Sequence, residues 1–262
     1  INEAKQLVGN GAKEITLLGQ NVNAYNFEGK KLSDLIFEIS KINDLKRIRY
    51  TTSHPKDFTQ DLIDAHKNCE KLMPLIHLPV QSGSNKILEA MNRKHTIEEY
   101  LGIVEKLNKV NSSIKFSSDF IIGYPGETLE DFKQTEKLIK NVKYINSYSF
   151  IFSARPGTPA FKLEKVNQSE AKERLISFQS LAEEIKTKYR ETLIGGISNV
   201  LFENKTKEGN KYFGRDEYLN SVIVISNESL VGEIKKVKIT SGNHNTLYGE
   251  TLSNLNQNNY AA

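Results

Sequence analysis

The chain has 262 residues, of which 38% are hydrophobic and 26% charged, with a net charge of +4, an ordinary globular composition. No stretch approaches the roughly 20 apolar residues of a membrane span, and no N-terminal segment indicates secretion. One cysteine, Cys69, excludes an internal disulfide framework and is typical of a reducing compartment. We therefore expect a soluble, cytoplasmic protein. Because it opens on Ile1 inside a helical pattern, we also expect the C-terminal piece of a longer one.

Short apolar runs alternate with amphipathic stretches along the first 160 residues, a pattern typical of a parallel sheet with crossover helices. We predict strands at Glu14–Leu18, Arg47–Thr51, Leu75–Leu78, Lys115–Ile122 and Ser147–Phe152. Between the strands, mostly apolar side chains recur at helical spacing in three sets. The first is Leu32, Leu35, Ile36 and Ile39; the second is Leu101, Val104 and Leu107; the third is Phe132, Thr135, Leu138 and Ile139. The sequence thus predicts an α/β fold.

Each predicted strand is followed by polar residues on a backbone that Gly or Pro makes irregular. The five segments are GQN at 19–21, TSHP at 52–55, HLPVQSGSN at 77–85, SDFIIGYPGET at 118–128 and SFIFSARPGTPAF at 149–161. Any one of them is explained by ordinary turns and helix caps. Because parallel strands place their carboxyl ends on one face, five together favour a ligand site there.

The composition changes after Phe161. Residues 168–192 read as one long amphipathic helix, and short β runs broken by Gly, Asn and Asp follow as far as Glu250. This predicts a small all-β barrel of OB-like type, with a disordered tail after it. From Arg190 onward there are 8 Lys and Arg against 8 Asp and Glu, so bulk charge does not mark the barrel as a nucleic-acid binder.

Five motifs, in this order and spacing, resemble the tRNA methylthiotransferases of the radical S-adenosylmethionine (SAM) superfamily. They are LLGQNVNAY at 17–25, TSHP at 52–55, HLPVQSGS followed by AMNRKHT at 77–96, DFIIGYPGET at 119–128 and FSARPGTPA at 152–160. The resemblance implies a partial radical SAM (β/α) barrel over residues 1–192 and a TRAM domain over residues 193–252, with the tail at 253–262. GQNVNAY, VQSGS and SARPGTPA resemble the tRNA enzymes more than the ribosomal-protein methylthiotransferases.

The reaction that this resemblance implies is transfer of a methylthio group to C2 of an isopentenylated adenosine next to the anticodon of tRNA. Its cofactors are SAM and two [4Fe-4S] clusters, and its partners are tRNA, an electron donor and a sulfur source. The enzyme is expected to be monomeric and not to bind a membrane. Cysteine thiolates hold such clusters. The chain lacks them, because Cys69 stands alone on a predicted helix, where we expect structural burial. We therefore expect no metal ligands in this chain and no unaided activity.

The resemblance also implies roles at the SAM site. Gly19, Gln20 and Asn21 would meet the amino group, and Gln81 and Asp119 the ribose hydroxyls. Arg93 would pair with the SAM carboxylate, although without the motif a solvated charge at a helix end is the simpler interpretation. Backbone from Ile121 to Gly123 would face the adenine. Arg155 would contact a phosphate or the SAM carboxylate. His54 and His77 stay open between proton transfer and structural hydrogen bonding, since the sequence shows no carboxylate partner. No catalytic residue is identified.

For the C-terminal barrel, the predicted RNA contacts are Lys205, Lys207, Lys211, Arg215, Lys236 and Lys238. Lys236 and Lys238 share one face by strand alternation. Tyr212, Phe213 and Tyr218 lie among the first set and would stack on bases. The alternative is a solvated face on a neutral domain.

Other functions stay open beside the tRNA enzyme. One is methylthiolation of an aspartate in a ribosomal protein, and another is an isolated tRNA-binding module. A third is an unrelated barrel enzyme for a phosphorylated metabolite, but GYPGET fits poorly as a phosphate-binding loop.

Overall fold

The computed structural model describes residues 1–252. The disordered tail expected at 253–262 lies outside them. Within the described residues no helix is long and apolar enough to cross a membrane.

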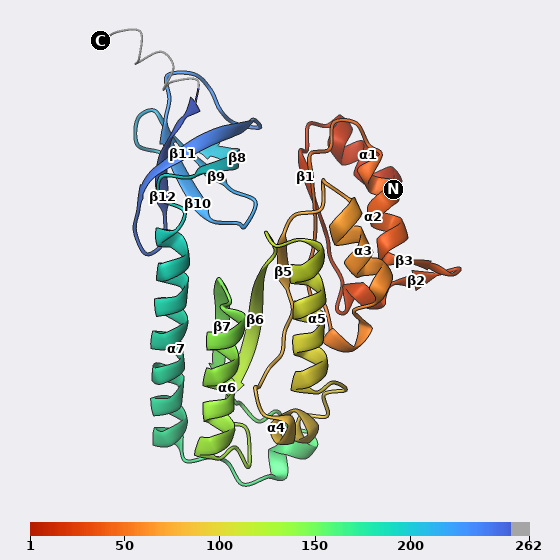
Figure 1. Ribbon diagram of the computed structural model, residues 1–262, viewed down its shortest axis with the longest axis vertical. Helices are drawn as coiled ribbons and strands as arrows, with labels where there is room; N and C mark the ends of the chain where they lie inside the picture. Colours follow the sequence, from red (N-terminus) through yellow and green to blue (C-terminus); the bar gives the residue numbers. More distant parts are fainter. Residues whose placement is uncertain (253–262) are drawn as a thin grey trace.

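Five parallel strands in the N-terminal part form a two-stranded sheet and a three-stranded sheet, which follow one another in an open, curved layer (Figure 1). The strands are β1 Glu14–Leu17, β4 Arg47–Tyr50, β5 Leu75–His77, β6 Lys115–Ile122 and β7 Asn146–Ile151. β1 pairs with β4, β5 with β6 and β6 with β7, all in parallel, and an isolated parallel bridge between Ile48 and Leu72 continues the sheet from β4 toward β5. The carboxyl ends of these strands therefore lie at one edge, as the pattern predicted.

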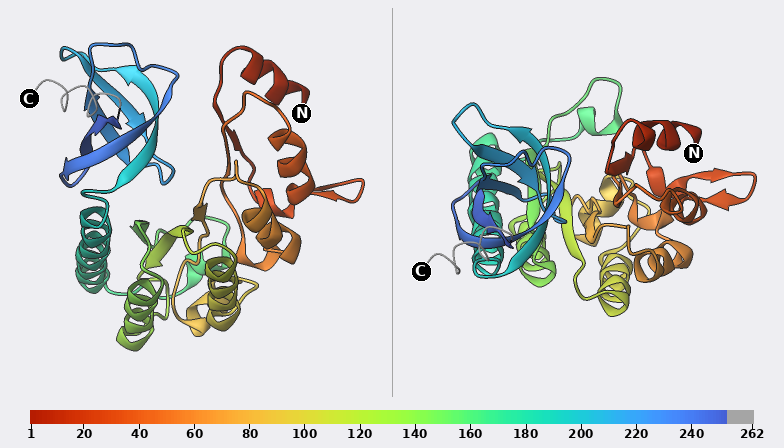
Figure 2. Two further views of the ribbon diagram at one scale, coloured as in Figure 1. Left: turned by 45° about the horizontal axis from the view of Figure 1, so that its top comes forward. Right: turned by 90° about the horizontal axis from the view of Figure 1, so that it is seen from above.

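Crossover helices cover the outer face of this sheet (Figures 1 and 2). They are α1 Asn2–Gly9, α2 Leu32–Ser40, α3 Gln60–Asn68, α4 Asn85–Ala90, α5 Ile97–Val110 and α6 Leu129–Val142. Short elements fill the loops after the strands: η1 Val22–Ala24, η2 Pro55–Asp57 and η3 Pro159–Lys162, with a hairpin of β2 Asn26–Phe27 and β3 Lys30–Lys31. Thr96 and Thr128 begin α5 and α6 with reciprocal capping boxes, which satisfy backbone donors at each helix start.

The core lies between sheet and helices. Its largest fully buried side chains include Tyr100, Tyr144, Phe120 and Phe178. The two buried hydroxyls are satisfied in series, because Tyr144 donates to Tyr100 at 2.9 Å and Tyr100 donates to the Leu78 carbonyl at 3.0 Å. The polar ends of these large rings therefore add no unpaired group to the core.

A long helix, α7 Gln168–Glu191, packs along β7 and leads to the C-terminal barrel (Figure 1). That barrel is closed, with the strand order β10-β12-β11-β8-β9. Its strands are β8 Ile197–Lys205, β9 Lys211–Arg215, β10 Ser221–Ile225, β11 Ile234–Gly242 and β12 Leu247–Thr251. Figure 2 shows the barrel stacked on α7 and over the amino ends of β6 and β7.

Both ends of each predicted parallel strand lie within one residue of the observed bounds, and β6 has the bounds expected. The small closed barrel is also confirmed. Cys69 is buried as expected, at 6% exposure, but it lies on the residue after α3 and not within a helix.

Candidate functional site

The loop after β5 joins two of the predicted site residues. Gln81 has a left-handed backbone with φ of 75°, which few non-glycine residues adopt. Its N–H donates to the Asp119 carbonyl at 3.0 Å, and its own carbonyl accepts from the Ile121 N–H at 2.9 Å. The strained turn therefore bonds the Gln81 backbone to β6 opposite Phe120, next to Asp119 along the strand.

Gly83 is fixed by its close approach to α6. A Cβ at this position would lie 2.5 Å from the backbone of Gln134 and Thr135, closer than real contacts allow. The space is used for a hydrogen bond, since the Gly83 N–H donates to the Thr135 hydroxyl at 2.9 Å. The glycine in HLPVQSGSN thus seats the loop directly on a helix.

Asp131 on α6 also holds the loop after β5 in place. Ser84, the N-cap of α4, donates to this carboxylate at 2.7 Å, and Lys86 lies 2.9 Å from it. The backbone N–H and the hydroxyl of Thr128 also donate to it, at 2.9 and 2.7 Å. Burial alone would raise the pKa of Asp131, but these hydrogen bonds hold it well below its usual range. The carboxylate is therefore ionised and ties the loops after β5 and β6 together.

The loop after β6 is anchored to α7. Gly123 has φ of 72°, and a Cβ there would meet the Ala171 side chain at 2.8 Å. Its N–H donates to Glu127 at 3.1 Å, and Arg174 on α7 donates to the same Glu127 side chain at 3.0 Å. Glu127 is 5% exposed, and burial raises its pKa against the opposing effect of Arg174. This buried pair, absent from the sequence predictions, sets the backbone expected to face the adenine.

At the end of β1, Gly19 and Gln20 are exposed, whereas Asn21 is held. The Asn21 side-chain NH2 donates to Asp57 at 2.6 Å. Its Oδ1 atom is buried, and no hydrogen-bond donor lies within reach among the described residues. An amide oxygen oriented in this way and left without a donor can accept from the ammonium group of a ligand.

His77 does have a carboxylate partner, which the sequence alone did not reveal. Its Nε2 lies 3.6 Å from Asp119, and its Nδ1 lies 3.0 Å from the Ser117 hydroxyl. Tyr148 on β7 packs edge-on against the imidazole. These side chains share the inner face of the sheet, because residues two apart on a strand point to the same side. His77 is therefore hydrogen-bonded to Ser117 and lies beside Asp119, just beyond hydrogen-bond distance.

Arg93 faces the same region. Burial lowers its pKa, and the charge of Asp119 opposes that effect, so the two groups interact. His95 lies nearby, buried and edge-on to His54, and burial together with His54 and Arg93 lowers its pKa to about 4. Neutral imidazoles beside a guanidinium avoid charge repulsion at neutral pH. His54 itself accepts from the Lys56 N–H at 3.1 Å, a structural bond.

Arg155 does not join this group by any contact among the described residues. Its side chain is exposed, and its carbonyl accepts from Thr158 in the turn before η3.

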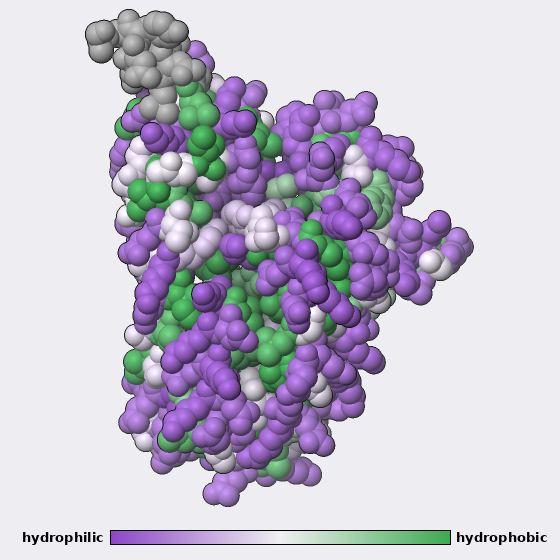
Figure 3. Space-filling view, in the orientation of Figure 1, coloured by the Kyte–Doolittle hydropathy of each residue, from purple (hydrophilic) through white to green (hydrophobic). Residues whose placement is uncertain are grey.

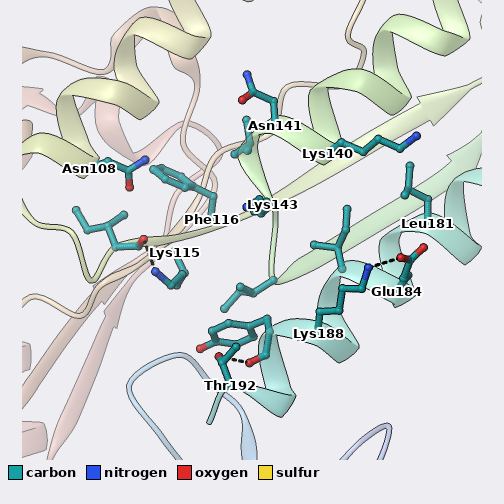
Figure 4. A pocket seen from close by; sticks show the side chains of 15 residues that line it. Asn108, Lys115, Phe116, Lys140, Asn141, Lys143, Leu181, Glu184, Lys188 and Thr192 are labelled. Carbon is teal, nitrogen blue, oxygen red and sulfur yellow. Dashed lines mark hydrogen bonds and ion pairs between the residues drawn. The ribbon is translucent and has the colours of Figure 1, made fainter.

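A cavity of about 480 Å³ follows the inner face of the sheet and includes Thr16, His77, Asp119 and Tyr148. We call it the lumen. A larger cavity, about 970 Å³, opens between α5, α6 and α7 near the amino end of β6 (Figure 4). Figure 3, in the orientation of Figure 1, shows apolar residues at the middle of the visible face, with hydrophilic residues around them. Because the larger cavity lies away from the strand ends that carry the polar loops, size does not locate the site.

In the C-terminal barrel, the predicted RNA contacts fall into two separate places. Lys236 and Lys238 are exposed on β11, opposite Asn199 and Ile197 at the start of β8. Lys205, Lys207 and Lys211 gather toward the other end of β8, about 20 Å away at roughly 3.3 Å per residue. Arg215 lies between the two places, because it pairs with Leu201, two residues from Asn199.

Several of the latter group are already engaged. Lys211 pairs with Glu208 at 3.0 Å, and Arg215 pairs with Glu203 at 3.2 Å. The expectation that Tyr212 stacks on bases is wrong, since its side chain is 5% exposed and belongs to the barrel core. Tyr218 is also engaged, because its hydroxyl donates to the Ser113 carbonyl at 2.9 Å. Within residues 1–252, Lys236 and Lys238 form no ion pair, and neither do Lys205 and Lys207, although Lys205 lies over the Tyr212 ring.

The residues present fit SAM but not an iron–sulfur cluster. The orphaned Asn21 oxygen, the Gln81–Asp119 pair and the partly buried Arg93 supply an acceptor, hydroxyl partners and a cation. A cluster needs several thiolates, whereas the chain has one cysteine, and it is buried. Within residues 1–252 no group of three or more His, Cys, Asp or Glu side chains could hold a metal ion.

Comparison with known proteins adds named relatives. The chain is 59% identical over 254 residues to tRNA-2-methylthio-N(6)-dimethylallyladenosine synthase of Pelagibacter ubique (strain HTCC1062), covering 95% of this chain and 57% of that protein. It is 50% identical to the enzyme of that name from Wolbachia pipientis subsp. Culex pipiens (strain wPip), covering 94% of this chain and 58% of that protein. The chain thus spans a little over half the length of these relatives.

Among solved structures, coproporphyrinogen III oxidase from Escherichia coli, a radical SAM enzyme, has a similar fold. It matches 94% of this chain and 62% of its own with a TM-score of 0.52 and 12% identity. The TRAM domain model matches residues 191–252, which contain the closed barrel. The radical SAM superfamily model matches residues 1–139, more than half of the chain, so this chain belongs to the radical SAM superfamily.

Proposed function

We propose that this chain is the SAM-binding and RNA-binding portion of an enzyme that transfers a methylthio group to C2 of N6-isopentenyladenosine beside the anticodon of tRNA. The observation that carries the proposal is 59% identity to a synthase of that modified nucleoside, together with the polar set at the strand ends. Two [4Fe-4S] clusters, an electron donor and a sulfur source belong to the proposal, with the cluster ligands supplied from outside this chain.

The SAM site in this proposal lies at the carboxyl ends of the strands. The Asn21 Oδ1 atom accepts from the amino group of SAM, and the Arg93 guanidinium pairs with its carboxylate. Gln81 and Asp119 hold the ribose hydroxyls, and the His77 Nε2 atom lies 3.6 Å from the Asp119 carboxylate. When bound, SAM supplies the methyl group and the hydrogen-abstracting chemistry of the superfamily.

Two buried contacts hold the loops around this site in fixed positions. Asp131 fixes the turn after β5, and the Glu127–Arg174 pair fixes the turn after β6. Both contacts are buried, so they hold the ligand-facing backbone in one arrangement before SAM binds. Preorganisation of this kind reduces the entropy lost on binding.

The tRNA is held by the C-terminal barrel. Lys236 and Lys238 lie on one exposed face of β11, with Val237 buried between them. Contacts of lysine to phosphate release counterions, so affinity for tRNA must fall steeply as salt concentration rises. A salt-independent affinity of the complete enzyme would contradict this assignment.

Mass spectrometry of tRNA nucleosides tests the proposal. Cells that lack the gene should lose the 2-methylthio group and retain N6-isopentenyladenosine, and the gene supplied in trans should restore the modification. Normal 2-methylthio levels in the deletion strain would refute the proposal. Loss of a methylthio group from ribosomal protein instead would assign the enzyme to the other substrate class.

A further inference from the structure

Two arginines at the amino end of the sheet reach into the C-terminal barrel. Arg47 and Arg49 lie two residues apart on β4, so their side chains leave the same face of the strand. They are 3% and 6% exposed, unusual for arginine, which is seldom buried without partners.

Arg47 bridges two segments of the barrel that are far apart in sequence. Its Nη1 donates to the Arg215 carbonyl at 3.1 Å, and its Nη2 donates to the Asn199 carbonyl at 2.6 Å. One guanidinium therefore bonds to the first barrel strand and to the end of the second. The planar fork of arginine suits such a two-acceptor geometry, because its two terminal nitrogens donate to separate carbonyls.

Arg49 bonds to the turn that follows β9. Its Nη1 donates to the Glu217 carbonyl at 2.9 Å, and its Nη2 donates to the Asp216 carbonyl at 3.3 Å. Glu14 on β1 supplies the counter-charge, with Oε1 lying 3.0 Å from the Arg49 Nε. This contact is an ion pair without an aligned hydrogen bond, because the Nε N–H has no acceptor in line. Glu14 also lies 3.6 Å from Arg47.

The turn that accepts these bonds is itself rigid. The fully buried Asp216 carboxylate accepts from the Tyr218 N–H at 2.9 Å and from the backbone and side chain of Asn220 at 2.8 Å. Leu219 takes a left-handed φ of 61° to close the turn. The carbonyls are therefore held in position by the barrel's own hydrogen bonds.

This turn also closes the lumen. Arg215 and Leu219 of the barrel line the same cavity as Asp119 and His77 of the sheet. The C-terminal barrel thus forms one wall of the space that leads to the carboxyl ends of the strands.

We propose that Arg47 and Arg49 are positioning residues that lock the C-terminal barrel onto the sheet, so that the RNA-binding surface and the SAM end move as one body and the lumen stays closed at its amino end. The functional consequence rests on the proposed tRNA methylthiotransferase function, whereas the lock itself does not.

The lock is tested by electron-spin distance measurements on this chain. Spin labels at Lys5→Cys on α1 and Asn204→Cys on β8, in a Cys69→Ala background, report the relative position of sheet and barrel. We expect a single narrow distance distribution for the parent chain. The Arg47→Gln/Arg49→Gln variant should broaden it at least two-fold, while Lys46→Gln, which removes an exposed neighbouring charge, should not. An unchanged distribution in the double variant would overturn the proposal.

Milder variants keep the test decisive if the double variant fails to fold. Arg49→Lys retains the charge but reaches only one carbonyl, and Tyr218→Phe removes the Ser113 contact without exposing a buried charge. Each should broaden the distribution to an intermediate width, and wild-type widths in both would overturn the proposal.

The functional arm uses Arg47→Gln in the complete enzyme, because Arg47 does not line the lumen. We expect tRNA affinity within two-fold of wild type, a ten-fold lower kcat and more SAM cleaved per methylthio group transferred. An unchanged ratio of cleavage to transfer would contradict the coupling. If nucleoside analysis refutes the proposed function, the distance measurement still decides whether the lock exists.

Discussion

The two ends of the parallel sheet are built from different kinds of contact. At the carboxyl end, the turn after β5 bonds through the Gln81 backbone to β6, and Asp119 of β6 lines the lumen. At the amino end, Arg47 and Arg49 leave the sheet and bond to backbone carbonyls of another domain. In the proposed function the first end contacts a ligand, whereas the arginines of the second end already bond to the barrel.

This difference explains why the residues at the carboxyl end could be predicted from the sequence, whereas the contacts at the amino end could not. A loop after a strand is a local feature, so its glycines and polar residues can be recognised in one short segment. The contacts of Arg47 and Arg49 join residues more than 150 positions apart and use carbonyls, which every residue carries. The repeated Arg in RIRY was the one available signal, because two arginines on the same face of a core strand need partners.

The largest effect is expected from Gly83→Ala, which tests how tightly the carboxyl-end loop sits on α6. The new methyl group would meet backbone atoms at 2.5 Å, so we expect a loss of about 3 kcal/mol in the free energy of unfolding, measured by chemical denaturation. Gly102→Ala in α5 is the matched control, because it meets nothing within 4 Å and should stabilise by up to ~1 kcal/mol. Similar stability in both variants would contradict the close approach.

Asp131→Asn should cost about 2 kcal/mol, since charge-assisted hydrogen bonds to Ser84 and Lys86 are weakened. The folded-state pKa of Asp131 is depressed, so its contribution is present above the unfolded value of 3.8 and is lost as pH falls below it. Unfolding curves from pH 6 to pH 3 should show a shallower pH dependence in the variant. An equally steep loss in both proteins would show that Asp131 is not the titrating group.

His66 adds a second pH window, on the side of the sheet near β4. Burial lowers its pKa from 6.5 to about 3, and its Nε2 lies 2.6 Å from the Tyr50 hydroxyl. The unfolded chain binds the proton more readily, so stability falls as pH drops below 6.5 toward 3, by about 2 kcal/mol between pH 7 and pH 5. His66→Gln should remove that slope. A variant whose stability still falls by the wild-type amount would place the titration elsewhere.

The smallest effect is expected from Lys236→Gln/Lys238→Gln, which separates RNA binding from folding. Neither lysine has an ion-pair partner among the described residues, so stability should change by less than about 0.5 kcal/mol. The Kd for tRNA should rise about five-fold at low salt and the salt dependence should flatten, as measured by filter binding. Lys211→Gln is the control, because Lys211 already pairs with Glu208. Equal effects of the two changes would remove the special role of β11.

The sequence predicted the parallel sheet, the long helix and the small barrel because periodicity and turn residues mark them directly. It also pointed to Gln81 and Asp119, which the structure places in contact through the backbone. It missed the Asp119 partner of His77, because strand pairing and not chain order brings them together. It misjudged Tyr212 for a related reason, since alternation alone does not say which face of a closed barrel is inside.

In the proposed enzyme, the carboxyl end of the sheet binds SAM, whereas the amino end and the barrel do not. Equilibrium binding of SAM to the complete enzyme, wild type against Asp119→Asn, tests it most directly. We expect the Kd for SAM to rise at least ten-fold with the Kd for tRNA unchanged. An unchanged Kd for SAM in Asp119→Asn would contradict the account.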